Sequence, residues 1–197
     1  MSKAAVREAD HVHGITSIFK AQMALEPGAL DALLEKWNHV RVLNRHDFLA
    51  QPGEIETNLY FVSSGTMRLY YPREAEEICV GFAYANTLIC SYPSFITQQP
   101  SQYYIQALTR TRLVSISRKD FYALFEPYRS LERCWRLLEE QALLGKIERE
   151  VEMLTFTPEE RYIRLLERSP HIFQLIPRKY IASYLRMSPE TLSRLGS

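Results

Sequence analysis

The sequence has few of the features that mark membrane, secreted or metal-binding proteins. It contains no uninterrupted apolar run of about 18 residues, and so it predicts no transmembrane helix. The N-terminal segment has acidic residues where a signal peptide needs an apolar core, which predicts a cytoplasmic protein. The cysteines, Cys79, Cys90 and Cys134, are odd in number and lie at no metal-ligand spacing. We therefore expect neither a disulfide framework nor a metal site.

Motifs of enzyme chemistry are also missing. The sequence has no nucleophile elbow, no paired-carboxylate spacing, no zinc motif and no P-loop, and Glu159-Glu160 is explained by helix capping. We predict no catalytic activity. The net charge of +1 is low for a nonspecific nucleic-acid binder, but from Pro177 onward four basic residues accompany one acid. This local excess suits phosphate contact, although it would also suit a solvated helical face.

The segment between Val40 and Ser117 is rich in β-branched and aromatic residues, and turn signals interrupt it. The predicted strands are 40–43, 58–62, 66–71, 77–82, 103–108 and 112–116. Many short strands at this spacing predict a sandwich or barrel of the jelly-roll type. Residues 1–20 have no clear periodicity and read as a loosely held leader, whereas Pro27–Trp37 reads as a short amphipathic helix.

Helical patterns follow the strands, so the predicted fold class is α+β. A short helix begins at Ser117, and a long one runs from about Ser130 to Thr155. Thr157-Pro-Glu-Glu160 then gives an N-cap, a proline at the first helical position and a glutamate at the capping-box position.

The long helix carries an apolar seam. Leu137, Leu144 and Val151 repeat every seven residues, and Ile147 and Leu154 occupy the matching second position of a coiled-coil pattern. A second apolar stripe runs along another side of the same helix. We predict that one stripe packs on the β-domain and that the seam forms a homodimer; the alternative is that the helix packs only against its own barrel.

The last residues read as two short helices joined by a tight turn. The first is apolar at helical spacing, and Ser188-Pro189 restarts the chain with an N-cap and a proline at the first position. This pattern is typical of a helix-turn-helix, whose second helix enters the DNA major groove. An ordinary αα-hairpin that closes a small bundle has the same pattern.

The order of elements and the local sequence resemble the Crp/Fnr superfamily of bacterial transcription regulators. Phe48–Glu54 is similar to the family's turn with Gly-Glu, and Leu59–Leu69 to the strand, turn and strand that follow. Segments 100–108, 157–162 and 179–185 resemble the short Bacteroidetes-type members. The resemblance implies a cyclic-nucleotide-binding-like double-stranded β-helix, a dimerisation helix and a DNA-binding unit. The implied divisions are a leader at 1–26, the β-roll at 27–128, the dimerisation helix at 129–156 and the helix-turn-helix at 157–197, with its wing absent or truncated.

The ligand pocket departs from the family pattern. Cys90-Ser91 stands where cAMP-binding members have Gly-Glu, and Ser101-Gln102 stands where they have Arg-Ser. A buried phosphate needs a cation or several amide donors, so we expect no cAMP binding of the usual kind and no other resident cofactor. Two alternatives remain for the pocket. It holds a less charged ligand through Ser91, Ser101, Gln102 and Tyr103, or it is collapsed on its own side chains.

The family's recognition helix implies the DNA contacts. Glu190, Thr191 and Arg194 match its base-reading and phosphate-reading positions, but Pro189 replaces the first arginine. The candidates for phosphate contact are three residues, Arg178, Lys179 and Ser188. The implied partners are double-stranded DNA with a pseudo-palindromic operator, a second copy of the chain, and RNA polymerase as a candidate. The rival hypothesis is a small-molecule sensor that acts through protein contacts, supported by the substituted arginine and by the end of the chain before a wing.

Overall fold

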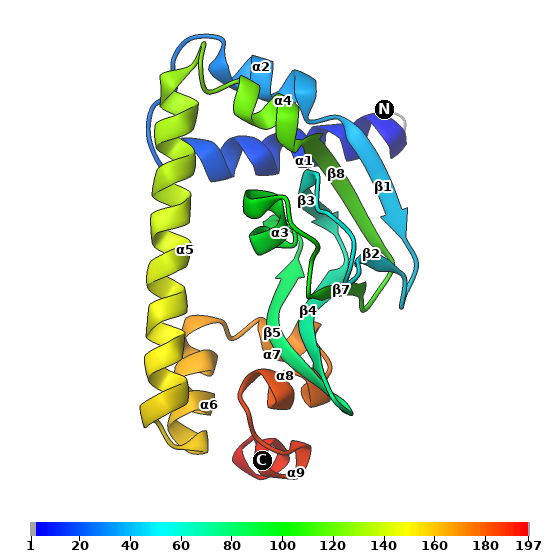
Figure 1. Ribbon diagram of the computed structural model, residues 1–197, viewed down its shortest axis with the longest axis vertical. Coiled ribbons are helices and arrows are strands. Elements are labelled where there is room, and N and C mark those ends of the chain that lie inside the picture. The colour runs from blue at the N-terminus through cyan, green and yellow to red at the C-terminus, as the bar shows by residue number, and fades with distance from the viewer. Residues whose placement is uncertain (1–2, 197) are drawn as a thin grey trace.

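A computed structural model describes residues 3–196, with side chains described from residue 11 onward. Helix α5 runs along one side of the molecule, the β-roll lies beside its first half, and α6 to α9 gather at its far end (Figure 1). The helices are α1 Lys3–Lys20, α2 Ala29–Lys36, α3 Tyr92–Thr97, α4 Arg118–Ala123, α5 Arg129–Thr155, α6 Pro158–Arg168, α7 Ile172–Leu175, α8 Arg178–Tyr184 and α9 Pro189–Leu195. Among these described helices, none is long and apolar enough to cross a membrane.

Two four-stranded antiparallel sheets form the roll, which confirms the predicted α+β class and the β-roll. One sheet has the order β1-β8-β3-β6 and the other β2-β7-β4-β5. The strands are β1 His39–Leu43, β2 Phe48–Ala50, β3 Asn58–Ser64, β4 Thr66–Arg73, β5 Glu76–Tyr84, β6 Thr87–Ile89, β7 Tyr104–Ala107 and β8 Thr111–Ser117. The six strands predicted from the sequence are present. The pattern missed β2 and β6, because three residues are too few to establish an alternation.

The expectation of a loosely held leader was wrong. Residues 3–20 form α1, and Ile15 and Phe19 are fully buried against the roll. Phe19 meets Trp37 edge to face at 6.1 Å between ring centroids. The stripe that α1 buries also includes His11 and Gly14. A hydrophobic pattern gives these two residue types no weight, and so the sequence did not reveal the helix.

Helix α5 confirms the predicted long helix, and its two halves differ. Leu131, Cys134 and Trp135 in the first half are buried in the main core, as the second apolar stripe predicted. The seam is exposed over most of its length: Leu144 is 61% exposed and Leu154 78%. The helix therefore packs on its own roll at one end and presents an uncovered apolar row at the other.

Substitution of Gly14 by alanine tests the packing of α1. A Cβ at this position would lie 2.3 Å from Phe61 Cζ, so we expect Gly14→Ala to lower the free energy of unfolding by about 1–3 kcal/mol. The matched control is Gly145→Ala in α5, where a Cβ meets nothing within 4 Å. Alanine there should raise stability by about 0.5–1 kcal/mol, because it restricts the unfolded chain. Urea denaturation measures both, and an unchanged stability of Gly14→Ala would mean that α1 is not packed on the roll.

Candidate functional site

The loop through α3 brings together two residues that the sequence singled out. Ser91 precedes α3 and Ser101 follows it, and their side chains are 1% and 5% exposed. The two hydroxyl oxygens lie 2.7 Å apart, and Ser101 Oγ also accepts a hydrogen bond from Tyr103 N at 3.0 Å. Gln102 lies exposed at the surface instead. Ser91 and Ser101 are therefore neighbours in space, and their hydroxyls satisfy each other.

A buried acid, Glu56, adjoins this pair, and sequence reasoning missed it. Its side chain is 7% exposed and accepts hydrogen bonds from Asn58 N at 3.1 Å and Ser91 N at 3.4 Å. Burial raises the pKa of the Glu56 carboxyl, although these backbone donors and Arg41 oppose the shift. A hollow of about 180 Å³ opens beside it, lined in part by Arg41, Tyr60 and Ser101. The only sequence signal was an isolated acid next to a β-rich segment.

The α8–α9 pair has the local geometry that its sequence predicts. Ser188 Oγ accepts from Thr191 N at 3.2 Å, and Pro189 is the first helical residue of α9. Leu192 is fully buried, whereas Glu190 and Arg194 face solvent. Hydrogen bonds from its own backbone N–H and from the Ser188 side chain lower the pKa of Glu190, which keeps this exposed carboxylate ionised.

The turn between α8 and α9 is fixed by backbone and side-chain contacts. Arg186 takes a left-handed conformation at φ 54°, and Met187 N donates to Ala182 O at 3.0 Å, as in a Schellman motif. The buried guanidinium of Arg161 donates from Nε to Leu185 O at 2.9 Å. It also donates from Nη1 to Phe156 O at 2.7 Å, and so it ties α8 to the start of α6. The sequence gave no signal for Arg161, which reads as one charge in a charged helix.

The proposed phosphate contacts do not form one cluster. Lys179 and Ser188 line one hollow at the junction of α8 and α9. The guanidinium of Arg178 lies against Gly196, since a Cβ there would sit 2.0 Å from Arg178 Nη2. Arg178 is thus at the carboxyl end of α9, where a cation is favoured by the helix dipole. Arg178 does not line the hollow that Lys179 and Ser188 line.

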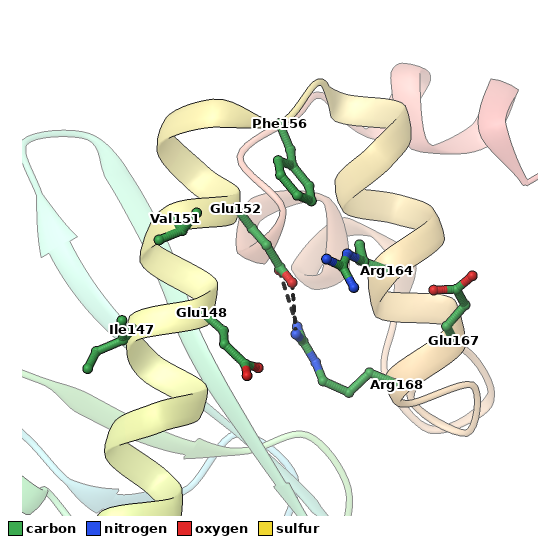
Figure 2. A pocket seen from close by; sticks show the side chains of 8 residues that line it. All are labelled: Ile147, Glu148, Val151, Glu152, Phe156, Arg164, Glu167 and Arg168. Carbon is green, nitrogen blue, oxygen red and sulfur yellow. Dashed lines mark hydrogen bonds and ion pairs between the residues drawn. The ribbon is translucent and has the colours of Figure 1, made fainter.

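A groove of about 540 Å³ separates the exposed half of α5 from α6 (Figure 2). Glu152 and Arg168 point toward each other across it and form an ion pair at 3.0 Å. The Glu152 side chain is 9% exposed, so this pair is screened less than a surface pair. Ile147 and Val151 of the seam line the same groove. Within residues 3–196, no group of three or more His, Cys, Asp or Glu side chains could hold a metal ion.

The roll is similar to a known domain family. Residues 40–128 match the cyclic nucleotide-binding domain family. The match covers the two antiparallel sheets together with α3 and α4. No curated protein matches the sequence.

Several solved structures have a similar fold. FixK2 from Bradyrhizobium japonicum has a TM-score of 0.67 at 16% identity, over 80% of this chain and 81% of that chain. The c-di-GMP-responsive global regulator CLP from Xanthomonas campestris has a TM-score of 0.63 at 18% identity, over 86% of this chain and 89% of that chain. The catabolite activator protein of Thermus thermophilus has a TM-score of 0.57 at 22% identity, over 91% of this chain and 84% of that chain. At these identities the likeness shows the fold and leaves the ligand and the partners to be argued from this chain.

We expect cAMP and cGMP not to bind. The buried Ser91–Ser101 pair offers a phosphate no cation, and the adjoining Glu56 disfavours an anion. Melting temperatures measured with millimolar cAMP, cGMP or the linear control AMP should therefore be equal. A ligand at 100-fold excess over its Kd would add about 2.7 kcal/mol of stability, so a clear rise with cAMP alone would contradict this prediction.

Proposed function

We propose that this protein is a dimeric, sequence-specific DNA-binding transcription regulator of the Crp/Fnr type, similar to the short Bacteroidetes-type members. One observation carries the proposal: α9 is capped by Ser188, anchored by the buried Leu192, and presents Glu190 and Arg194 to solvent. A recognition helix needs this arrangement, because its base-reading side chains must leave the protein while its other face stays packed.

The exposed side chains on α9 can distinguish bases. Arg194 can donate to guanine O6 and N7 together, and the ionised Glu190 can accept from cytosine N4. Lys179 and Ser188 would contact phosphates, which sets the register without reading sequence. The proposed role of α9 is therefore base readout, with α8 positioned across the backbone and RNA polymerase as the candidate downstream partner.

The second half of α5 would supply the dimer interface. The side chains of Leu144, Ile147, Val151 and Leu154 are between 48% and 78% exposed and follow one seam of the helix. An apolar row of this length is costly to leave in water, and pairing with the same row of a second copy would bury it. Two-fold symmetry then predicts a pseudo-palindromic operator whose half-sites lie about one helical turn apart.

The roll would serve as the effector or protein-interaction domain. The paired Ser91 and Ser101 support a collapsed pocket, while the hollow beside Glu56 leaves room for a small ligand of low negative charge. If the α8–α9 pair were instead a protein-interaction module, the roll would be a sensor that acts without DNA. Steep weakening of complex formation with rising salt distinguishes DNA binding from that alternative.

DNA binding can be tested with selected duplexes and an arginine variant. We expect a discrete site to emerge from genomic fragments, and Arg194→Ala to weaken binding to it by about 10-fold to 100-fold through lost base contact. Arg164→Ala, an exposed arginine on α6, is the matched control and should bind as the parent protein does. Gel shifts at several salt concentrations measure both. The proposal fails if no fragment is bound at a discrete site at moderate salt.

The dimer can be tested at the seam. We expect Leu144→Glu to convert a dimer into a monomer, because each buried seam would then contain an unpaired carboxylate. The control is Ile163→Glu on α6, which is 45% exposed and lies outside the seam. Sedimentation equilibrium gives the mass of each variant. A parent protein that is monomeric at high concentration, or an unchanged mass of Leu144→Glu, would reject the seam as the interface.

A further inference from the structure

The β4–β5 hairpin lies against α8 (Figure 1). The hydroxyl of one residue of α8, Ser183, makes two hydrogen bonds to the hairpin. Ser183 Oγ accepts from Cys79 N at 3.0 Å and donates to Glu77 O at 3.1 Å. Both partners are backbone groups of β5 near the hairpin tip. The contact is therefore specific to the arrangement in which the hairpin covers α8, and it would be lost if the two separated.

A buried arginine strengthens the same contact. Arg68 of β4 is 4% exposed, and its guanidinium lies between the rings of Tyr70, at 4.1 Å, and Tyr180 of α8, at 4.2 Å from the centroids. It also makes an ion pair with Glu77 at 2.6 Å. Cations held over aromatic rings out of water contribute more than exposed ones. Arg68 thus fastens α8 to the roll, although it takes no part in the proposed DNA surface.

The hairpin places acids in front of the proposed phosphate contacts. Glu76 pairs with Arg186 at 3.7 Å. A hollow of about 480 Å³ separates the hairpin from the α8–α9 pair. Six of the residues that line it are Glu76, Glu77, Lys179, Arg186, Ser188 and Pro189. Two carboxylates therefore share one small space with the side chains that would hold DNA phosphates.

We infer that this arrangement excludes DNA, and that the acidic β4–β5 hairpin is an autoinhibitory element which must leave α8 before α9 can enter a major groove. The inference rests on the proposed DNA-binding function. The first turn of a recognition helix has to approach the bases closely, and here Glu76 and Glu77 of the hairpin line the same hollow as Ser188 and Pro189. The carboxylates of Glu76 and Glu77 also repel a phosphate that approaches Lys179.

Closed and open arrangements then compete, and DNA selects the open one. The apparent affinity for DNA is the intrinsic affinity reduced by the fraction of molecules that are open. Weakening a contact that exists only in the closed arrangement raises that fraction. Such a change tightens DNA binding even when it touches no DNA-contacting residue.

Two variants that weaken the closed arrangement test the inference, and only one of them changes the charge. Ser183→Ala removes both hydroxyl contacts without a change of charge and should tighten binding roughly three- to tenfold. Arg68→Met removes a buried cation, so simple electrostatics predicts weaker DNA binding, whereas release of the hairpin predicts tighter binding. Thr97→Ala on α3 is the matched control and should bind as the parent does, because the Thr97 hydroxyl bonds only to the backbone of nearby residues, Pro93 and Gln99.

The measurements are fluorescence anisotropy with a random-sequence duplex of about 30 base pairs at low salt, and hydrogen exchange of the Cys79 amide. Faster exchange of that amide in Arg68→Met reports release of the hairpin, because this substitution leaves Ser183 in place. Circular dichroism checks folding, and if Arg68→Met does not fold, Ser183→Ala decides alone.

Tighter binding by the folded variants, with Thr97→Ala unchanged, supports autoinhibition. If the parent binds DNA and both variants bind it equally well or more weakly, the inference is overturned while the DNA-binding function stands. If Cys79 exchange accelerates and no variant binds DNA, the proposed function fails, and DNA exclusion fails with it.

Discussion

The buried guanidinium of Arg68 holds the two halves of the molecule together. Transfer of a cation from water into a protein costs free energy unless the surroundings replace its hydration. Here Gln106 Oε1 accepts two of its hydrogen bonds, at 3.0 and 2.7 Å, and Glu77 supplies the opposite charge. Tyr70 and Tyr180 cover the two faces. Gln106, Glu77 and Tyr70 belong to the roll, whereas Tyr180 belongs to α8, so the guanidinium is fully covered only when the roll and the C-terminal helices are docked.

The C-terminal unit consequently shares its core with the roll. Leu108 follows β7 yet belongs to the core of α6 to α9, and Phe82 of β5 packs on Tyr184 with ring centroids 5.3 Å apart. Helix α5 also contacts α8 directly, because Arg149 of α5 donates a hydrogen bond to Tyr184 O at 2.9 Å. In the first half of α5, Glu139 accepts a hydrogen bond from Tyr92 of α3. A change in the loop through α3 therefore has a continuous chain of contacts, through α5, to α8 and α9.

Local signals in the sequence predicted most of the elements and part of the site. The caps at Thr157 and Ser188 depend only on residues three positions apart, and both form as predicted. The long helix followed from its periodicity. The structure brings together Ser91 and Ser101, which the family resemblance singled out, but their role in a pocket stays a prediction. The seam of α5 is exposed, but whether a second copy covers it stays a prediction. Helix α1 was missed because it buries a histidine and a glycine, which carry no hydrophobic signal.

The sequence by itself determined six of the eight described strands, the capped helix starts at Thr157 and Ser188, and the long helix. It also determined that Ser91 and Ser101 offer no phosphate-binding cation. Those properties depend on neighbouring residues or on the residue type alone. The tertiary structure decided which charges are buried and which surfaces face each other. Arg68 reads as an ordinary strand residue until α8 covers it, and Glu56 reads as a turn acid until Ser91 approaches it. The hairpin carboxylates likewise acquire a role only because Cys79 and Ser183, far apart in the chain, meet across the two halves. Burial and facing charge are properties of packing between distant segments, and no local pattern encodes them.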